Sequence, residues 1–311
     1  MRRDKITIVG AGNVGATTAH IAAARGLGDI VLLDIVEGLA EGKALDIAQS
    51  SPIQLSSQVV TGTRDWKQTA GSDVVIITSG FARRPGMSRD DLLAKNVGIV
   101  QQVGRLVAEH SPESIVIVVC NPLDAMVYTT ATVTGFAPNR VMGMAGALDS
   151  ARFSYFVACE LGVSVEEVKC VLMGGHGDDM VPLPRFSSVG GIPVTELLAE
   201  SKVAELIERT RKGGIEVVNL LGHSAYYAPA AGTVKMAEGI LRDKKTVVSC
   251  CAYCGDEYNA GGYFVGVPAV LGRNGVEKVI ELDLNESERA EFDRSLAHVK
   301  QLVAKVEELL R

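Results

Sequence analysis

The first half of the chain alternates short, mainly apolar runs with longer segments of helical periodicity. The apolar runs are rich in β-branched residues, which is typical of parallel strands that are covered on both faces. A regular alternation of strand and helix indicates right-handed βαβ units. The predicted strands are Ile6–Val9, Ile30–Leu33, Val74–Thr78 and Ile115–Val119. The predicted helices are Val14–Arg25, Gly38–Ser50, Asp91–Glu109 and Leu123–Thr134.

After about Met144 the pattern becomes a mixture of helices and short strands, which predicts a second, α+β domain. We therefore expect two domains, residues 1–144 and 145–311. The expected helices are Asp149–Leu161, Val194–Leu221 with an interruption at Gly213-Gly214, Tyr226–Arg242, and a last helix from about Glu286. The expected strands are Val168–Met173, Thr246–Ala252, Tyr263–Leu271 and Val276–Leu282. One apolar face is expected on the last helix, formed by Phe292, Leu296, Val299, Leu302, Val306 and Leu309.

Composition supports a parallel α/β protein and excludes several functions. Glycine makes up 33 of 311 residues, and only 5% are aromatic. The net charge, 31 − 37 = −6, argues against a nucleic-acid partner or an anionic membrane surface. No apolar run reaches the roughly 18 residues of a membrane span, and Ile6–Val9 is too short for the apolar core of a signal peptide. We expect a cytoplasmic protein.

A C-x-x-C motif is present at Cys251 and Cys254, with Cys250 beside it. Such a motif can bind zinc or carry redox chemistry. No second pair follows at ligand spacing, however, and the flanking residues 246–249 read as a buried strand. We therefore expect these cysteines to pack as small apolar side chains and expect no metal site.

A glycine-rich motif directly follows the first predicted strand and opens the first predicted helix. Gly10, Gly12 and Gly15 form G-x-G-x-x-G, and the second strand then ends at Asp34, 19 residues after Gly15. This arrangement is the dinucleotide fingerprint of a Rossmann-type, doubly wound parallel sheet. The helix N-terminus favours phosphates, and a carboxylate at Asp34 accepts ribose hydroxyls while repelling a 2′-phosphate. The motif therefore predicts NAD rather than NADP.

Three further segments place ionisable residues in positions that suit catalysis. Residues 80–91 hold three arginines in a loop with Gly and Pro, Asp149 and Arg152 share one helix face, and His176 stands between glycines at a strand end. Each has an ordinary interpretation too: a solvated basic loop, a surface ion pair and a loop histidine. Together they supply a base, a carboxylate to orient it, a cation for a developing alkoxide and a clamp for a carboxylate substrate. Hydride transfer between NAD and an alcohol that also carries a carboxylate uses all four.

These motifs, in this order, resemble the lactate/malate dehydrogenase family, and in particular its lactate-dehydrogenase-like branch. The resemblance runs essentially end to end and includes the segments 83–89, 121–124, 148–153 and 175–178. It implies reversible hydride transfer between (S)-malate and NAD, giving oxaloacetate and NADH. It also implies a closed homo-oligomer, a tetramer or a dimer, which composition alone does not show.

The resemblance assigns roles to single residues. It implies that His176 exchanges the proton, that Asp149 orients His176, and that Arg89 polarises the reacting carbonyl. Substrate would be bound by Arg83, Arg89, Asn121 and Arg152. Cofactor would be bound by Gly10, Gly12, Asn13, Val14, Gly15, Asp34, Asn96, Val119 and Asn121.

The choice of substrate depends mainly on Arg83. Malate-type members carry Arg at the matching loop position, where lactate-type members carry a neutral residue. A second carboxylate in a closed site needs a cation, and over pyruvate the same cation would be left unpaired. Arg84 is the alternative residue for this role. A lactate or broader 2-hydroxy-acid dehydrogenase, and a non-catalytic NAD-binding sensor, remain as alternatives.

Overall fold

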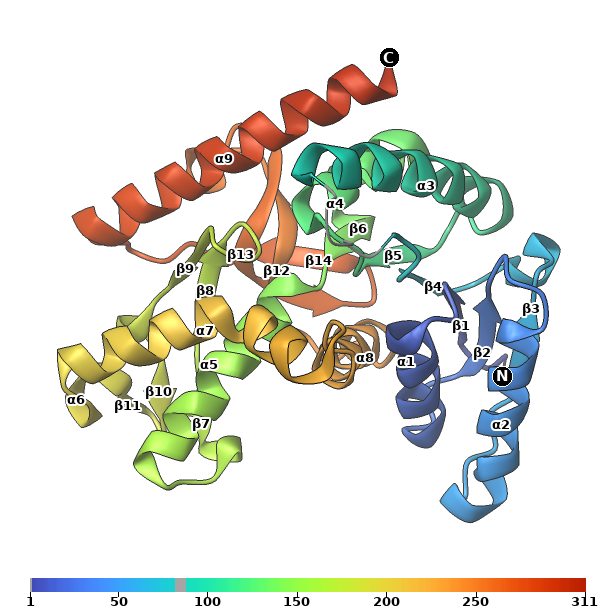
Figure 1. Ribbon diagram of the computed structural model, residues 1–311, viewed down its shortest axis with the longest axis horizontal. Coiled ribbons are helices and arrows are strands. Elements are labelled where there is room, and N and C mark those ends of the chain that lie inside the picture. Colours follow the sequence, from blue (N-terminus) through green and yellow to red (C-terminus); the bar gives the residue numbers. More distant parts are fainter. Residues whose placement is uncertain (1, 82–87) are drawn as a thin grey trace.

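The protein, in a computed structural model that describes residues 2–81 and 88–311, is built on one large mixed sheet (Figure 1). Its first six strands are parallel, in the order β3-β2-β1-β4-β5-β6. They are β1 (Lys5–Val9), β2 (Asp29–Leu33), β3 (Val60–Thr63), β4 (Val74–Ile77), β5 (Ile115–Val118) and β6 (Val141–Gly143). The connecting helices are α1 (Asn13–Ala24), α2 (Leu39–Gln54), α3 (Arg89–His110) and α4 (Leu123–Thr134).

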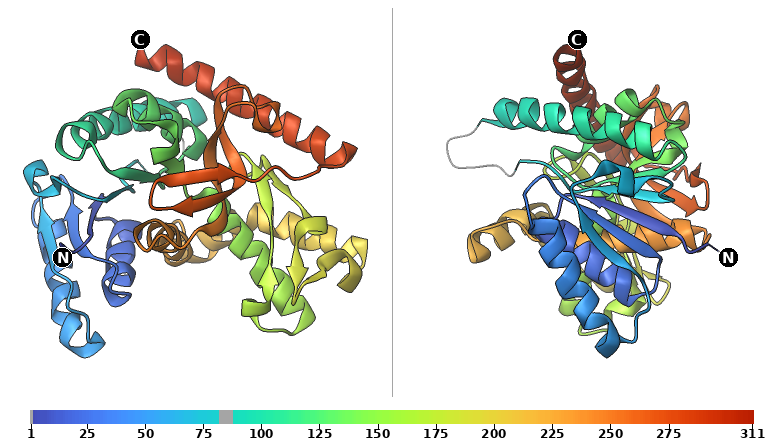
Figure 2. Two further views of the ribbon diagram at one scale, coloured as in Figure 1. Left: turned by 180° about the vertical axis from the view of Figure 1, so that it is seen from behind. Right: turned by 90° about the vertical axis from the view of Figure 1, so that its right-hand side faces the viewer.

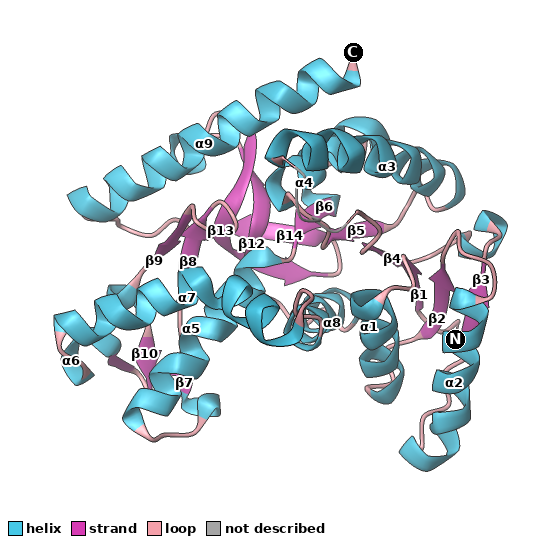
Figure 3. Ribbon diagram, in the orientation of Figure 1, coloured by secondary structure: helices cyan, strands magenta, loops and turns pink. Residues whose placement is uncertain are grey.

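Helices cover both faces of this parallel sheet, as Figure 3 shows. Ile6 and Ile8 of β1 belong to the apolar cluster that includes α1, whereas Val75 and Ile77 of β4 belong to the cluster that includes α3 and α4. Alternate strand residues thus face opposite helical layers, which explains the unbroken apolar runs in the sequence. The predicted doubly wound α/β fold is confirmed.

Strand β3 was not predicted from the sequence. Its four residues, Val-Thr-Gly-Thr, lie at the edge of the sheet and are mostly half-buried, so they form no apolar run. Gly62 in this strand allows α2 to pass close by, because a Cβ there would lie 2.2 Å from the carbonyl oxygen of Ala40.

The C-terminal half extends the same sheet with antiparallel strands, joined where Cys251 lies opposite Gly143. These strands are β8 (Leu172–Gly174), β9 (Met180–Pro182), β12 (Thr246–Cys254), β13 (Tyr263–Gly272) and β14 (Gly275–Val279). A separate small sheet contains β7 (Val168–Lys169), β10 (Ser188–Val189) and β11 (Ile192–Pro193). The helices are α5 (Ala145–Leu161), α6 (Val194–Leu197), α7 (Glu200–Leu221), α8 (Tyr227–Leu241) and α9 (Glu286–Leu310). The short 3-10 helices are Trp66–Thr69, Pro138–Arg140, Val165–Glu167, Pro184–Phe186 and Glu257–Asn259.

The two halves of the chain share one body. Helix α9 runs across the molecule and packs against α3 and α4 of the first half, and the view from behind in Figure 2 shows the same arrangement. Helix α8 packs against α1 from the other side of the sheet. The predicted division after residue 144 stays a prediction. Within the described ranges, no helix is both long and apolar enough to span a membrane.

The single strand predicted over residues 168–173 is wrong. The chain forms β7 in the small sheet and β8 in the large one, with a bend between them. The N–H groups of Cys170 and Val171 donate to the hydroxyls of Ser154 and Ser187, at 3.2 and 3.1 Å. Side-chain acceptors thus replace a strand partner at the bend.

Two predictions about helices are also corrected. Helix α7 continues through Gly213 and Gly214, and the break lies at residues 198–199 instead. On α9 the buried face steps from Val299 by four residues to Val303, whereas a step of three to Leu302 was expected; Leu302 is only partly buried and Leu309 is exposed.

Candidate active site

His176 and Asp149 are in direct contact at the centre of the site. Asp149 lies in the first half of α5 and is buried, and His176 lies in the loop after β8. The ring atom Nδ1 of His176 is 2.8 Å from Oδ2 of Asp149. A carboxylate can only accept, so Nδ1–H donates and the neutral ring keeps its lone pair on Nε2. This is the arrangement of an oriented general base.

The surroundings of His176 favour its charged form. Burial alone would lower the pKa of the imidazole, but the charge and hydrogen bond of Asp149 and the charge of Asp124 raise it. The nearby guanidinium of Arg152 acts in the same direction as burial. The balance holds the pKa of His176 above its ordinary value, so the ring is suited to hold a proton as well as to take one.

Arg152 lies one turn after Asp149 on α5. Its Nη1 is 3.3 Å from Oδ1 of Asp149, and its side chain is only 17% exposed. Gly213 and Gly214 of α7 face it, and a Cβ on Gly213 would lie 3.1 Å from Cδ of Arg152. The glycines that looked like a helix break thus make room for this side chain. One carboxylate engages only part of a guanidinium with five N–H donors, so Arg152 retains donors for an anion.

The predicted loop arginines are only partly placed by the structure. Arg83 and Arg84 lie outside the described residues. Arg89 is the first residue of α3 and lies inside the capping box that Ser88 and Asp91 form. Its Nη2 is 3.5 Å from Oδ2 of Asp178, and both side chains are more than four-fifths exposed. The structure therefore brings Arg89 to the loop that carries His176, but not to the His176 ring.

Asn96 links, by hydrogen bonds, the two segments that follow the central strands β4 and β5, and Asn121 lies in the second of these segments. Asn96 is buried on α3, where its Oδ1 accepts from the N–H of Phe81 at 2.6 Å and its Nδ2 donates to the carbonyl of Asn121 at 2.6 Å. The Asn121–Pro122 peptide is cis, and Val119 continues from β5 by donating to the carbonyl of Ile77. Asn96 thus shapes the carboxyl edge of the sheet, where ligands bind in open α/β folds.

The glycine motif has the geometry that a pyrophosphate needs. Gly10 has a φ of +105°, and a Cβ on Gly15 would lie 1.8 Å from the carbonyl oxygen of Gly10, so both positions require glycine. A Cβ on Gly12 meets no heavy atom within 4 Å, which leaves open space in front of the helix. Helix α1 begins at Asn13, followed by Val14, and directs its first N–H groups toward that space.

Asp34 holds this turn from the end of β2. Its Oδ2 accepts from the N–H of Ala11 at 2.6 Å, and its Oδ1 accepts from the N–H of Val36 at 2.9 Å. Each carboxylate oxygen has a further lone pair, so Asp34 can still accept from ribose hydroxyls. Lys43, which the sequence did not single out, donates to the carbonyl of Ala11 at 2.7 Å. These residues fit NAD.

Two residues that sequence reasoning missed anchor the His176 loop. Asp124 of α4 accepts from the N–H of His176 at 3.0 Å. Ser295 of α9 accepts from the N–H of Gly175 at 2.8 Å and donates to the carbonyl of Asp179 at 2.6 Å. Both are buried. In the sequence, Asp124 stands out as a carboxylate in the otherwise apolar start of a predicted helix. Nothing in the sequence distinguishes Ser295 in this way.

The three neighbouring cysteines lie in β12 and are buried. Burial raises the pKa of Cys250 and of Cys254 to about 12, and it raises that of Cys251 well above its usual value. Thiols in this state are protonated and pack as apolar groups. Among the residues that the structure describes, no cluster of His, Cys, Asp and Glu is arranged to hold a metal.

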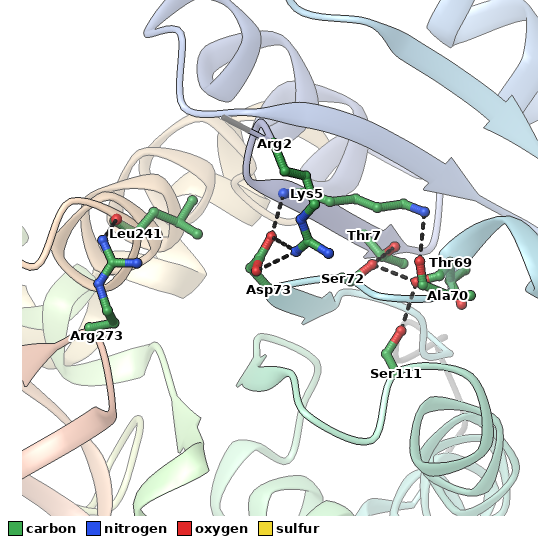
Figure 4. Close-up of polar contacts among 10 residues, drawn as sticks. All are labelled: Arg2, Lys5, Thr7, Thr69, Ala70, Ser72, Asp73, Ser111, Leu241 and Arg273. Atoms are coloured by element: carbon green, nitrogen blue, oxygen red, sulfur yellow. Dashed lines mark hydrogen bonds and ion pairs between the residues drawn. The ribbon is translucent and has the colours of Figure 1, made fainter.

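A second charged region lies at the opposite, amino-terminal edge of the parallel sheet (Figure 4). A hollow of about 570 Å³ there is lined by Arg2, Arg3 and Lys5, among others. Arg2 bonds both carboxylate oxygens of Asp73, at 2.6 and 2.7 Å, and Lys5 donates to the carbonyl of Ala70 at 2.9 Å. None of the residues lining this hollow is a histidine, so the oriented base, and with it the active site, is at His176 instead.

Comparison with known families decides the relationship of the chain. The model of the lactate/malate dehydrogenase NAD binding domain matches residues 4–143, and that of the alpha/beta C-terminal domain matches residues 146–310. The chain belongs to the lactate/malate dehydrogenase family. The resemblance drawn from the motifs is confirmed, and the protein is an NAD-dependent oxidoreductase.

Individual relatives support both the fold and the activity. A malate dehydrogenase from Rhodopirellula baltica is 56% identical over 100% of this chain and 99% of its own length. The apo structure of malate dehydrogenase from Picrophilus torridus has a TM-score of 0.97 at 45% identity, covering 99% of this chain and 98% of that one. The structure of lactate dehydrogenase from Cryptosporidium parvum with lactic acid and NAD has a TM-score of 0.95 at 41% identity, covering 99% of each chain.

Proposed function

We propose that this chain catalyses the reversible oxidation of (S)-malate to oxaloacetate with NAD. The observation that carries the proposal is the contact of His176 with Asp149, beside Arg152 and at the same edge of the sheet as the glycine motif. The name malate dehydrogenase, borne by relatives at 52–56% identity, supports the substrate.

The residues of this chain supply the proton chemistry. In oxidation, Nε2 of His176 takes the hydroxyl proton of the substrate, and Asp149 stabilises the imidazolium that results. When bound, NAD supplies the hydride acceptor for this oxidation, and NADH the hydride donor for the reverse reaction. In reduction, protonated His176 gives its proton to the carbonyl oxygen. The donors that Arg152 retains bind the carboxylate next to the reacting carbon.

The specificity for a dicarboxylate is assigned to the loop before α3. We propose that Arg83 binds the second carboxylate and that Arg89 polarises the carbonyl. Support comes from physical chemistry, because a buried carboxylate needs a cation, and a cation over pyruvate would have no partner. The likeness to a lactate dehydrogenase shows that the fold alone does not decide between these substrates.

A side-by-side assay of wild-type enzyme tests this function. Reduction of oxaloacetate and of pyruvate is followed through the absorbance of NADH, and both assays are repeated with NADPH. We expect kcat/KM to favour oxaloacetate over pyruvate and NADH over NADPH by at least about 100-fold. Comparable turnover of pyruvate would instead identify a broader 2-hydroxy-acid dehydrogenase, and NADH binding without turnover of either acid would identify a sensor.

We also propose that the chain forms a closed homo-oligomer, a dimer or a tetramer. Helix α2 and the residue after it carry the large apolar side chains Leu45, Ile53 and Leu55, which are 60%, 86% and 91% exposed. Such a group favours contact with another subunit. Light scattering should give the mass of a dimer or tetramer, and a monomer at micromolar concentration would contradict this. The cytoplasmic location stays a prediction.

A further inference from the structure

Asp124 is a buried carboxylate directly behind the His176 loop. It lies in the first turn of α4 and is 6% exposed. Its Oδ2 accepts from the main-chain N–H of His176 at 3.0 Å, and a Cβ on Gly175 would lie 3.4 Å from the same oxygen. Its other oxygen, Oδ1, is buried and has no hydrogen-bond partner among the described residues.

We propose that Asp124 is a positioning residue for proton transfer, which fixes the main chain of His176 from behind and places a second negative charge near its ring. This inference rests on the proposed function of His176. It assigns to Asp124 no contact with substrate or cofactor, since the carboxylate acts through the histidine alone.

The loop itself supplies little to hold His176 in place. Gly174 and Gly177 have φ values of +80° and +91°, and Gly175 lies between Gly174 and the histidine. Glycines contribute no side chain that could pack and limit the motion of the loop. His176 is therefore held by its ring, which Asp149 of α5 contacts, and by its N–H, which Asp124 of α4 contacts. A cavity of about 10 Å³ behind the histidine is lined by both carboxylates.

A structural role alone would need only an acceptor for the N–H of His176, which a neutral amide also supplies. Burial of a charge is unfavourable, and the hydrogen bonds that Asp124 accepts compensate only part of that cost. The carboxylate differs from an amide because it brings charge to the ring, and this difference bears on proton transfer.

The charged and titratable groups around this pair and its loop come from α3, α5, β12 and α9. Asp149 and Arg152 face His176 from α5, and Cys251 of β12 faces Asp124. Later in the same loop, Asp178 pairs with Arg89 of α3 at 3.5 Å, and Asp179 pairs with His298 of α9 at 2.6 Å. The pKa of Asp124 is raised on balance, because burial outweighs the N–H and the charge of His176 and the thiol of Cys251, which all act to lower it.

Two substitutions separate the two contributions of Asp124. Asp124→Asn keeps an oxygen that can accept the N–H of His176 but removes the charge. We expect it to lower kcat by only about threefold. We also expect the acid limb of the pH–rate profile, where the rate of malate oxidation rises with pH, to shift to lower pH by about half a unit or more. Asp124→Ala also removes the acceptor, and we expect kcat to fall by about 10- to 100-fold with an unchanged dissociation constant for NADH.

The matched control is Asp243→Asn, which removes one carboxylate from a surface ion pair with Lys245. Asp243 has a φ of +49°, a conformation that Asn also tolerates, and we expect a wild-type profile for this variant. A wild-type acid limb in Asp124→Asn would overturn the proposal, even if Asp124→Ala were unstable. If the wild-type enzyme did not reduce oxaloacetate at all, that result would instead overturn the proposed function.

Discussion

Gly213 of α7 stands against Arg152 of α5, so closely that a Cβ on the glycine would lie 3.1 Å from Cδ of the arginine. A helix interior normally disfavours glycine by roughly 0.5–1 kcal/mol relative to alanine. Glycine at position 213 therefore lowers the stability of α7 somewhat but leaves space beside Arg152, the residue assigned to the substrate carboxylate.

Substitution of this glycine should affect substrate binding more than stability. In Gly213→Ala the gain in helix propensity, up to about 1 kcal/mol, is offset by the displacement of Arg152, so we expect the free energy of unfolding to change by less than that amount. The same displacement should raise KM for oxaloacetate by about three- to tenfold, because a small misplacement weakens a two-point clamp. Denaturant unfolding and steady-state kinetics measure the two effects.

Gly214→Ala is the matched control for this prediction. A Cβ on Gly214 would lie 3.9 Å from Nη2 of Arg152, which is ordinary contact distance. The control should gain helix stability without a change in KM. An equal rise of KM in both variants would show that α7, rather than Arg152, responds to the substitution.

The raised pKa of His176 predicts opposite pH dependences for the two directions of the reaction. Malate oxidation needs the neutral ring, so kcat/KM should rise with pH through the pKa of His176. Oxaloacetate reduction needs the protonated ring, so kcat/KM should fall through the same pKa, which should lie above 6.5. Profiles in both directions from pH 5 to pH 9 test this. A common midpoint below 6.5, or profiles of the same sense, would contradict it.

Asp34 should govern the choice between the two nicotinamide cofactors. Asp34→Asn keeps an oxygen for one N–H of the glycine turn but removes the charge that repels a 2′-phosphate. We expect kcat/KM with NADH to fall by about tenfold and the preference for NADH over NADPH to shrink by a similar factor. A preference equal to that of the wild type would remove Asp34 from cofactor selection.

Local sequence predicted most of the parallel half of the fold. Strand β1, the turn at Gly10–Gly15 and Asp34, directly after β2, all lie in the first 34 residues, so hydrophobic runs and glycine spacing suffice to find them. Strand β3 was not predicted, because an edge strand needs no apolar run. The prediction of one strand over residues 168–173 is wrong, because two serines from other elements accept N–H groups in the middle of this segment.

The sequence predicted those parts of the site whose residues lie close together in one motif. The spacing of Asp149 and Arg152 on one helix face is local, and the structure brings them to His176. The anchors of the loop are not local, since Asp124 and Ser295 lie 52 and 120 residues from their partners. The space that Gly213 provides for Arg152 depends on the packing of α7 on α5, which no periodicity reveals.

The central claim is that His176 exchanges the substrate proton, and His176→Ala tests it most directly. Oxaloacetate reduction is measured at saturating NADH, and NADH binding is measured separately by fluorescence titration. The account predicts a fall in kcat of about 10²- to 10⁴-fold, with NADH binding equal to that of the wild type. Wild-type turnover by His176→Ala would contradict it.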